Sequence, residues 1–158
     1  MRDPTNDPSQ ERLNELFEYR DGSLYNKTKR SQRSPKGSRA GTLNKTGYER
    51  ILIDKRLSLS HRLIYIMHEG DIPEGLVIDH KNGIRNDNRI DNLRVVTRQQ
   101  NQFNTNAKGY YWNKVNKKWQ AGICVNYKIK YLGAFDKEED ARQAYLVAKE
   151  KYHIIEER

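Results

Sequence analysis

Residues 76–104, LVIDHKNGIRNDNRIDNLRVVTRQQNQFN, carry the pattern that decides the fold of this chain. The apolar residues 76–78 predict a short strand, and the Asn-, Asp- and Gly-rich residues 81–91 predict an irregular loop held by side-chain hydrogen bonds. A second apolar run predicts the returning strand. Thr97 then begins a helix, with Gln100 at the capping-box position. The segment is therefore expected to fold as strand, loop, strand and helix.

Side chains suited to holding a metal ion and a water gather in this segment. Asp79 and His80 end the first strand. Asn92 precedes the second strand, and Asn101 lies in the helix. A carboxylate and carboxamides can hold one hard divalent ion, and a neutral imidazole can take a proton from a water beside it. Because strand neighbours point to opposite faces, the strand must twist or end at Asp79 and His80 for both to reach one phosphate.

The positive charge of the chain, +9 in total, is unevenly distributed. Residues 22–45 hold seven Lys or Arg, residues 105–135 hold six Lys, and neither stretch contains Asp or Glu. Residues 46–104 are nearly balanced, with nine basic and eight acidic residues. Two basic arms around a neutral centre suit contacts with nucleic-acid phosphates and indicate a metal-assisted phosphodiesterase. The alternative, basic loops that only maintain solubility, explains two acid-free stretches less well.

Composition excludes several other classes of protein. With 35% hydrophobic residues, one large core is not expected, and two or three small modules fit better. The single Cys124 excludes a disulfide framework and a CxxC-type zinc site. No apolar run reaches the roughly 20 residues of a membrane span, and the N-terminus lacks the apolar stretch of a signal peptide. A cytoplasmic protein without a membrane partner is therefore expected.

The first half of the chain predicts two hairpins and a helix. In chain order we expect a disordered start over residues 1–12, a hairpin over 13–25 turning at Asp21-Gly22, a basic loop over 26–41, a hairpin over 47–59 turning at Asp54 to Arg56, and a helix from the N-cap Ser60 to Gly70. The buried stripe of that helix is expected to be Leu63, Ile64 and Met67.

The last third of the chain predicts a small sheet with one helix. Strands are expected around Trp112 and over residues 119–125 and 128–135, with Trp119, Ala121 and Ile123 facing the core. Asp136 is expected to cap the helix, with Glu139 at the capping-box position. The helical stripe is expected to be Ala141, Ala144, Tyr145, Ala148 and Tyr152.

Residues 61–104 resemble the HNH homing-endonuclease family, in particular its phage-type members. The likeness runs through HRL at 61–63, DH at 79–80, NG at 82–83, the run N-x-N-R-I-x-N-L over 86–93, and a closing Asn in the helix. The resemblance implies an α+β fold with a central ββα-metal (His-Me finger) nuclease, in which two strands and a helix surround one divalent ion.

The same resemblance implies a role for each polar residue. His80 matches the general base, and Asp79 matches the metal-binding acid before it. Asn92 matches the middle Asn, which tethers the loop and positions the His. Asn101 matches the last position, where phage-type members often have a metal-binding Asn instead of the founding His. Hard oxygen ligands favour one Mg²⁺ or Mn²⁺ per active site over Zn²⁺.

Each of these residues also has a plainer interpretation. An Asp-His pair is commonly a polar strand end, and Asn101 could face solvent on a surface helix. Asn86, Asp87 and Asn88 are expected to brace the loop. His61 is expected to pack or to contact phosphate.

Residues 105–152 resemble the Apetala-type DNA-binding domain of plant ethylene-response factors, through KGYYW, KKWQAGI and KYLGAFDKEEDARQAY. This resemblance implies a three-stranded antiparallel sheet in a DNA major groove with one helix behind it. Plant members have charged side chains where this chain has Gly122, Cys124 and Ile129, so weak base readout and mainly backbone contact are expected. The DNA face is expected to comprise Lys108, Tyr111, Asn113, Gln120 and Tyr131. The alternative is a generic small α+β domain.

The segment from ELFEYRDGSLY to GYERILIDKRLSLSHRL also resembles the leader of phage HNH proteins. Within it, phosphate contacts are expected from Lys27, Lys29, Arg30, Arg33, Lys36 and Arg39. Three modules are thus expected: a basic hairpin and loop region over residues 1–45, the nuclease domain over 46–104, and the Apetala-type domain over 105–158.

Together these patterns predict a phage-type, metal-dependent endonuclease that acts on double-stranded DNA in the host cytoplasm. The resemblance implies products with 5′-phosphate and 3′-hydroxyl ends. One active site per chain predicts nicking by a monomer, or double-strand cutting by a DNA-induced dimer or two successive nicks. The first alternative is an inactive DNA-binding protein on a relic nuclease fold, against which the complete set of site residues argues. An RNA-binding module ranks third, because the sheet lacks paired aromatic RNP signatures.

Overall fold

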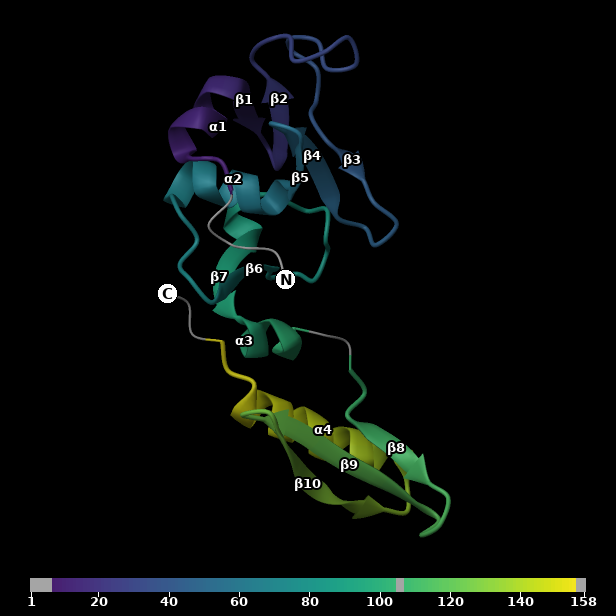
Figure 1. The fold of residues 1–158 in the computed structure, drawn as a ribbon. Helices are drawn as coiled ribbons and strands as arrows, with labels where there is room; N and C mark the ends of the chain where they lie inside the picture. Colours follow the sequence, from purple (N-terminus) through teal and green to yellow (C-terminus); the bar gives the residue numbers. More distant parts are fainter. Residues whose placement is uncertain (1–6, 105–106, 156–158) are drawn as a thin grey trace. The chain divides into compact units, whose positions relative to one another are not determined.

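The computed structural model describes residues 7–104 and 107–155, and the chain divides into two compact α+β units, Met1–Val95 and Val96–Arg158. The elements of the first unit are α1 (Gln10–Leu16), β1 (Phe17–Arg20), β2 (Ser23–Asn26), β3 (Thr42–Leu43), β4 (Glu49–Ile53), β5 (Arg56–Leu59), α2 (Ser60–Glu69), β6 (Leu76–His80), the 3-10 helix η2 (Ile90–Asn92) and most of β7 (Leu93–Thr97) (Figure 1). The second unit contains α3 (Arg98–Phe103), β8 (Tyr110–Asn113), β9 (Lys118–Val125), β10 (Lys128–Phe135) and α4 (Glu138–Tyr152). In the described ranges, no helix is long and apolar enough to cross a membrane.

Both hairpins expected in the first unit are present. Strands β1 and β2 pair antiparallel around Asp21 and Gly22, whose φ angles are 41° and 78°. A two-residue turn with positive φ at both central residues matches the right-handed twist of the two strands that it connects. Strands β4 and β5 pair in the same way around Asp54 and Lys55, with φ of 47° and 64°, and the short β3 adds to the free edge of β4.

Helix α1 contradicts two predictions, because residues 10–12 were expected to be disordered and residues 13–16 to belong to the first hairpin. It begins after Ser9, whose side chain accepts a hydrogen bond from the Arg12 backbone N–H, as N-cap serines do. It is held by Leu13, which is fully buried. Of the predicted disordered start, residues 1–6 lie outside the described residues.

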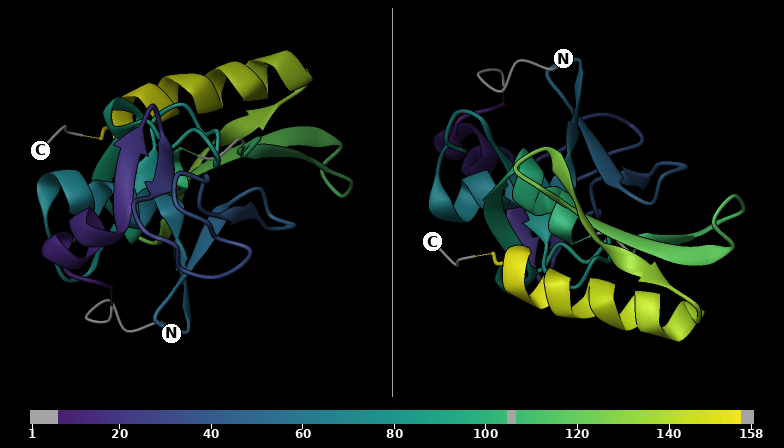
Figure 2. Two further views of the ribbon diagram at one scale, coloured as in Figure 1. Left: turned by 90° about the horizontal axis from the view of Figure 1, so that it is seen from above. Right: turned by 90° about the horizontal axis from the view of Figure 1, so that it is seen from below.

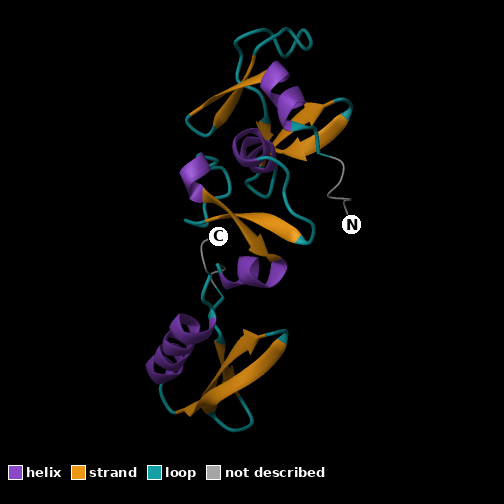
Figure 3. Ribbon diagram, turned by 90° about the vertical axis from the view of Figure 1, so that its left-hand side faces the viewer, coloured by secondary structure: helices purple, strands orange, loops and turns teal. Residues whose placement is uncertain are grey.

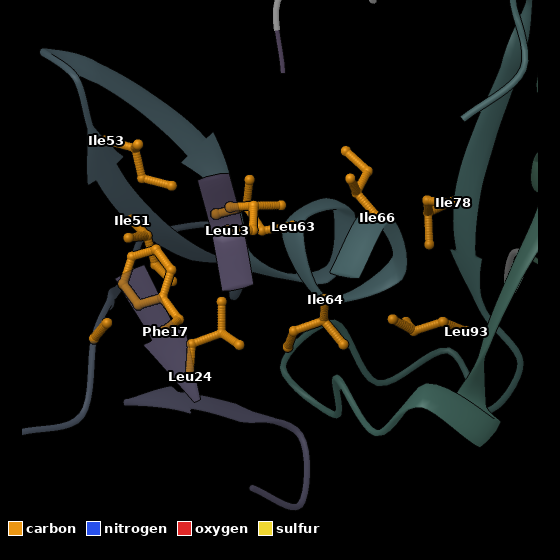
Figure 4. Close-up of a cluster of buried hydrophobic side chains, with 11 residues drawn as sticks. Leu13, Phe17, Leu24, Ile51, Ile53, Leu63, Ile64, Ile66, Ile78 and Leu93 are labelled. Atoms are coloured by element: carbon orange, nitrogen blue, oxygen red, sulfur yellow. The ribbon is translucent and has the colours of Figure 1, made fainter. Parts of the chain in front are cut away.

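A single hydrophobic core organises the first unit (Figure 4). Side chains of α1, both hairpins, the loop before β3, α2, β6 and β7 form it, namely Leu13, Phe17, Leu24, Ala40, Ile51, Ile53, Leu63, Ile64, Ile66, Ile78 and Leu93. The first hairpin therefore shares its core with the central segment, across the boundary expected at residue 45. The division into three modules stays a prediction.

Helix α2 follows its prediction with two corrections. Ile66 is buried where Met67 was expected, and Met67 packs at the edge of the core. Leu59 occupies the N-cap position and Ser60 is the first helical residue, so the predicted serine cap is wrong. Gly70 ends the helix as expected, with φ of 84°.

The second unit is a three-stranded antiparallel sheet, ordered β10-β9-β8, with α4 lying along one face (Figures 2 and 3). Ala121 and Ile123 of β9 are buried on the helix side, where Tyr145 and Ala148 pack, which confirms the prediction for these two residues, whereas Trp119 is only partly buried. The predicted Asp136 cap is wrong. Lys137 occupies the N-cap position, and the Asp136 carboxylate pairs instead with Lys118 at 2.9 Å.

Truncation of a core side chain on β4 tests the hydrophobic core of the first unit. Ile51 is 2% exposed and its neighbour Leu52 is 56% exposed. Ile51→Ala is expected to lower the free energy of unfolding by about 2–5 kcal/mol, because it leaves a cavity. Leu52→Ala, the matched control, is expected to change it by less than about 0.5 kcal/mol. Chemical denaturation measures both, and equal losses would contradict the assigned faces of β4.

Candidate active site

Asp79 and His80 are the last two residues of β6, and both are buried, with 6% and 4% of their surface exposed. Neighbouring side chains of a continuous strand point to opposite faces, so both can reach one phosphate only where the strand ends or twists. Strand β6 ends at His80. Their partners lie in different elements: Arg94 on β7 for Asp79, and Asn88 in the following loop for His80. The strand end thus carries a carboxylate and an imidazole, each held in place inside the protein.

The carboxylate of Asp79 pairs with Arg94 across the β6–β7 sheet. The Nε and Nη2 groups of Arg94 both donate to Oδ2 of Asp79, at 3.0 and 2.8 Å. A buried carboxylate is costly unless it is paired and hydrogen-bonded, and the guanidinium meets that requirement. Arg94 carried no signal in the sequence beyond its place in the predicted strand after the loop.

The imidazole of His80 belongs to a buried chain of polar groups. Its Nε2 lies 3.0 Å from Oδ1 of Asn88, and Nδ2 of Asn88 donates to Oε2 of Glu49 over 3.5 Å. Oε1 of Glu49 accepts from Nη2 of Arg39 at 2.8 Å. Asn88 was expected only to brace the loop, and Glu49 carried no signal in the sequence beyond its place in a predicted hairpin.

Two further rings surround His80. The His61 ring meets it edge-on with centroids 4.9 Å apart, and Tyr48 lies 5.5 Å from His61 and 6.1 Å from His80. Burial lowers the pKa of His61 to about 3, and the nearby charges of His80 and Arg62 lower it further in the same direction. His61 is therefore neutral at physiological pH and packs against His80.

Asn92 braces the loop that follows His80. Its Oδ1 accepts from the Asn82 backbone N–H at 3.1 Å, its Nδ2 donates to the Asp87 carbonyl at 2.7 Å, and its own carbonyl accepts from the Lys81 N–H at 2.8 Å. Hydrogen bonds from Arg89 lower the pKa of the Asp87 carboxyl in the same loop. Asn92 thus fixes the chain directly after His80, whereas the side-chain contact with the imidazole comes from Asn88.

The first hairpin supports the other end of this loop. The Ile90 backbone N–H donates to the Tyr19 hydroxyl at 3.2 Å. The turn glycine approaches the loop so closely that a Cβ on Gly22 would lie 2.9 Å from the Arg89 nitrogen. Residues 88–90 are therefore held from outside the central segment, which places Asn88 beside His80.

Asn101 lies exposed on α3, in the second unit, whereas Asp79, His80 and Asn92 belong to the first. The predicted capping box is confirmed, with Thr97 and Gln100 bonded reciprocally at 3.1 and 2.9 Å. At the other end of α3, Phe103 stacks on His153 with centroids 4.0 Å apart, and Nε2 of His153 lies 2.9 Å from the Cys124 carbonyl oxygen. The helix that carries Asn101 is thus attached to the C-terminal sheet.

The oxygen donors predicted for the site suit a hard cation that binds through few protein ligands. Over residues 7–104 and 107–155, no group of three or more His, Cys, Asp or Glu side chains could hold a metal ion. A closed zinc site is therefore absent from these ranges. Mg²⁺ commonly binds through one or two protein oxygens and completes its shell with water and substrate phosphate. The Asp79 carboxylate supplies one such oxygen in the first unit, and the Asn101 carboxamide is an exposed oxygen donor of the second.

The basic loop is only partly available for phosphate contacts. Arg30 lies over the Phe17 ring, 4.8 Å from its centroid, and donates to the Leu52 carbonyl, so it fastens the loop to the core. Arg39 is paired with the buried Glu49. Lys27 reaches the Asn14 carbonyl at 2.6 Å. The other three predicted residues, Lys29, Arg33 and Lys36, have exposed positions.

The open face of the C-terminal sheet carries three of the five residues expected to face DNA. Tyr111 pairs with Gln120 across β8 and β9, and its hydroxyl donates to Oε1 of Gln120 at 2.6 Å. Tyr131 pairs with Gly122 on the same face and is exposed. Asn113 instead accepts from the backbone N–H groups of residues 115 and 116 in the following turn. Lys108 is exposed before β8.

Comparison with known proteins shows what this chain, and its central segment in particular, is similar to. Residues 58–103 match the family of HNH endonucleases. An uncharacterized HNH endonuclease of Acanthamoeba polyphaga mimivirus is 34% identical over 116 residues, which cover 70% of this chain and 61% of the viral protein. A solved structure on DNA binding and cleavage by the HNH homing endonuclease I-HmuI is 30% identical, with a TM-score of 0.46, over 61% of this chain and 55% of that chain. The resemblance of the central segment to HNH endonucleases is thus confirmed over residues 58–103.

The depressed pKa of His61 predicts a pH dependence of stability. Between about pH 6.5 and its folded pKa of about 3, the unfolded chain binds a proton at His61 that the folded chain does not. The free energy of unfolding should therefore fall on acidification, by up to about 1.4 kcal/mol per pH unit from this group. His61→Phe should flatten the curve between about pH 7 and 5. His68→Phe, which removes an exposed histidine of the same helix, should keep the wild-type slope. Parallel curves for all three proteins would contradict the assignment.

Proposed function

We propose that the HNH endonuclease domain at residues 58–103 makes this chain a metal-dependent endonuclease that hydrolyses phosphodiester bonds of duplex DNA. The observation that carries the proposal is the end of β6, where a carboxylate held by Arg94 adjoins an imidazole held by Asn88. A proton acceptor and a hard oxygen ligand, each fixed before substrate arrives, are the two protein groups that such a hydrolysis requires. The chain spans 61% of the viral relative's length, and that relative is itself uncharacterized.

In the proposed reaction, His80 takes a proton from a water as its oxygen attacks phosphorus. The bond from phosphorus to the 3′ oxygen breaks, solvent protonates that oxygen, and the products carry 5′-phosphate and 3′-hydroxyl ends. General-base catalysis of this kind contributes about 10²–10⁴-fold to the rate. His61 is neutral beside His80, so it adds no second positive charge that would oppose proton uptake.

Asp79 and Asn101 would hold the divalent cation, for which their hard oxygens favour Mg²⁺ or Mn²⁺. When bound, such an ion stabilises the negative charge of the phosphate and of the leaving oxygen. Both Arg94 hydrogen bonds go to one oxygen of Asp79, Oδ2, so they fix the direction of the carboxylate. One such site per chain favours nicking by a monomer, with double-strand cutting left to a DNA-induced dimer or two successive nicks.

Two surfaces would hold the duplex. The first is the exposed basic set Lys29, Arg33 and Lys36 in the loop between β2 and β3, which suits phosphates. The second is the open sheet face with Tyr111, Gln120 and Tyr131, which we assign to an Apetala-type domain lying against DNA. That face carries no arginine at these positions, which favours backbone contact over base readout.

A plasmid assay tests the proposed activity. Wild type, His80→Ala and His68→Ala are incubated with supercoiled plasmid in Mg²⁺, Mn²⁺ or EDTA. Wild type and the control His68→Ala, which removes a histidine outside the site, are expected to give open-circle product that EDTA abolishes. His80→Ala should lose at least about 10²-fold in rate, because the proton acceptor is gone. DNA binding without cleavage by any of the three proteins, on plasmid and on a phage DNA library, would favour the inactive DNA-binding alternative.

Salt dependence tests the basic loop. The triple variant K29Q/R33Q/K36Q is expected to bind duplex DNA more weakly. Its slope of log affinity against log salt should be smaller by about 0.9 for each phosphate that the loop no longer neutralises. R142Q/K151Q, on the helix that covers the other face of the C-terminal sheet, is the matched control and should leave the slope near wild type. An unchanged slope for the triple variant would remove the loop from the proposed DNA surface.

A further inference from the structure

Glu49 is a buried carboxylate at the end of an apolar row. On β4 it shares the core-facing side with Ile51 and Ile53, and only 3% of its surface is exposed. Its side chain passes under Gly41, where an added Cβ would lie 2.8 Å from Cγ of Glu49. A buried charge carries a large desolvation cost, and a hydrophobic residue at this place would commonly serve stability as well or better. The local fold nonetheless leaves room for this carboxylate.

The two hydrogen bonds of the Glu49 carboxylate determine how the Asn88 amide is oriented. Arg39 donates to Oε1 at 2.8 Å, and Nδ2 of Asn88 donates to Oε2 over 3.5 Å. A carboxylate only accepts hydrogen bonds, so the Asn88 amide must turn its NH₂ group toward Glu49. The amide oxygen of Asn88 then necessarily faces Nε2 of His80, at 3.0 Å. Asn88 is 2% exposed, so its amide is oriented by these protein partners.

The orientation of the amide decides which nitrogen of His80 carries the proton. An amide oxygen only accepts, so Nε2 of His80 must be the N–H donor of the pair. The neutral ring then has its acceptor lone pair on Nδ1. We propose that Glu49 is a positioning residue that sets the tautomer of His80 through Asn88, and that Nδ1 is consequently the atom that takes the proton from water. The second clause rests on the proposed function, whereas the tautomer can be measured without cleavage.

Asn88 is the middle member of the relay Glu49–Asn88–His80. The first hairpin holds the backbone beside it, and Glu49 holds its side chain. Tyr19 accepts from the Ile90 N–H, and Gly22 leaves no space between the first hairpin and the Arg89 nitrogen. The loop therefore fixes the backbone of residues 88–90, and Glu49 fixes the one remaining choice, which end of the Asn88 amide faces His80. A structural role for Glu49 alone would require its pairing with Arg39 but would leave the tautomer of His80 unaffected.

The substitution Glu49→Gln separates these two roles. Arg39 donates, so the amide oxygen of the new glutamine should stay toward Arg39 and its NH₂ group should face Asn88. The Asn88 amide would then turn, present its own NH₂ group to His80, and require Nε2 to accept. We expect the His80 tautomer to switch from Nε2–H in wild type to Nδ1–H in E49Q. The ¹⁵N chemical shifts of the ring, recorded without metal at alkaline pH, distinguish the two forms, and loss of the signals in His80→Gln assigns them.

A second substitution should reverse the switch. In E49Q/N88D, the amide introduced on β4 donates to the carboxylate introduced in the loop. That carboxylate can only accept, so the Nε2–H tautomer should return at the net charge of wild type. Glu74→Gln, at an exposed position of the same unit, is the control and should match wild type. On DNA, E49Q should cleave about 10²–10⁴-fold more slowly at unchanged DNA affinity, and the double variant should recover much of that loss.

Two results would overturn the proposal. The first is the Nδ1–H tautomer in wild type, which needs no variant and holds even if E49Q does not fold. The second is an unchanged Nε2–H tautomer in a folded E49Q. If the tautomers switch as expected but no protein cleaves DNA, the relay is supported and the proposed nuclease activity fails. If wild type cleaves and the tautomers do not switch, the activity stands and the role of Glu49 fails.

Discussion

The burial of Asp79 and His80 at the end of β6 is the constraint on which the rest of the first unit depends. Polar groups removed from water must find partners inside the protein, and each unpaired one costs about 1–3 kcal/mol or more. Arg94 on β7 meets the carboxylate, and Asn88 meets the imidazole. These partners fix the direction of both side chains, and in the proposed reaction groups preorganised in this way would lose little on reaching the transition state.

The surrounding elements can be understood as the means of holding those partners. The loop that carries Asn88 is braced internally by Asn92 and externally by the first hairpin through Tyr19. The second hairpin supplies Glu49, and α2 supplies His61. The core that joins α1, both hairpins and α2 therefore does more than stabilise the chain, because it connects distant segments to one imidazole. The loop that follows His80 depends for its shape largely on hydrogen bonds between Asn, Asp and backbone groups.

Local signals in the sequence predicted most of the elements. The Asp-Gly turn, the alternation of β9, the end of α2 at Gly70 and the capping box at Thr97 each depend on residues close together in the chain, and each is present. The wrong predictions arose where residues distant in the chain made the deciding contacts. Asp136 pairs with Lys118 in place of capping α4, and α1 forms in a polar stretch because Leu13 is buried by distant residues.

The sequence identified the candidate site residues but not the residues that support them. Asp79, His80, Asn92 and Asn101 lie in one recognisable segment, whereas Glu49 and Tyr19 contribute from elements 30 or more residues away. Such contacts arise from tertiary packing, which no pattern of spacing within the segment encodes. The same limit applies to the intramolecular partners of Arg30 and Arg39, the Leu52 carbonyl and the Glu49 carboxylate, which the sequence did not reveal.

A crystal structure of the chain with duplex DNA and Mn²⁺, with anomalous scattering used to locate the metal, would test the central claim most directly. The account predicts one Mn²⁺ bound by a carboxylate oxygen of Asp79 and the carboxamide oxygen of Asn101. It also predicts that Nε2 of His80 stays on Asn88 while Nδ1 faces the water beside the scissile phosphate. Absence of Mn²⁺ from Asp79, or a His80 ring turned so that Nε2 faces the phosphate, would contradict it.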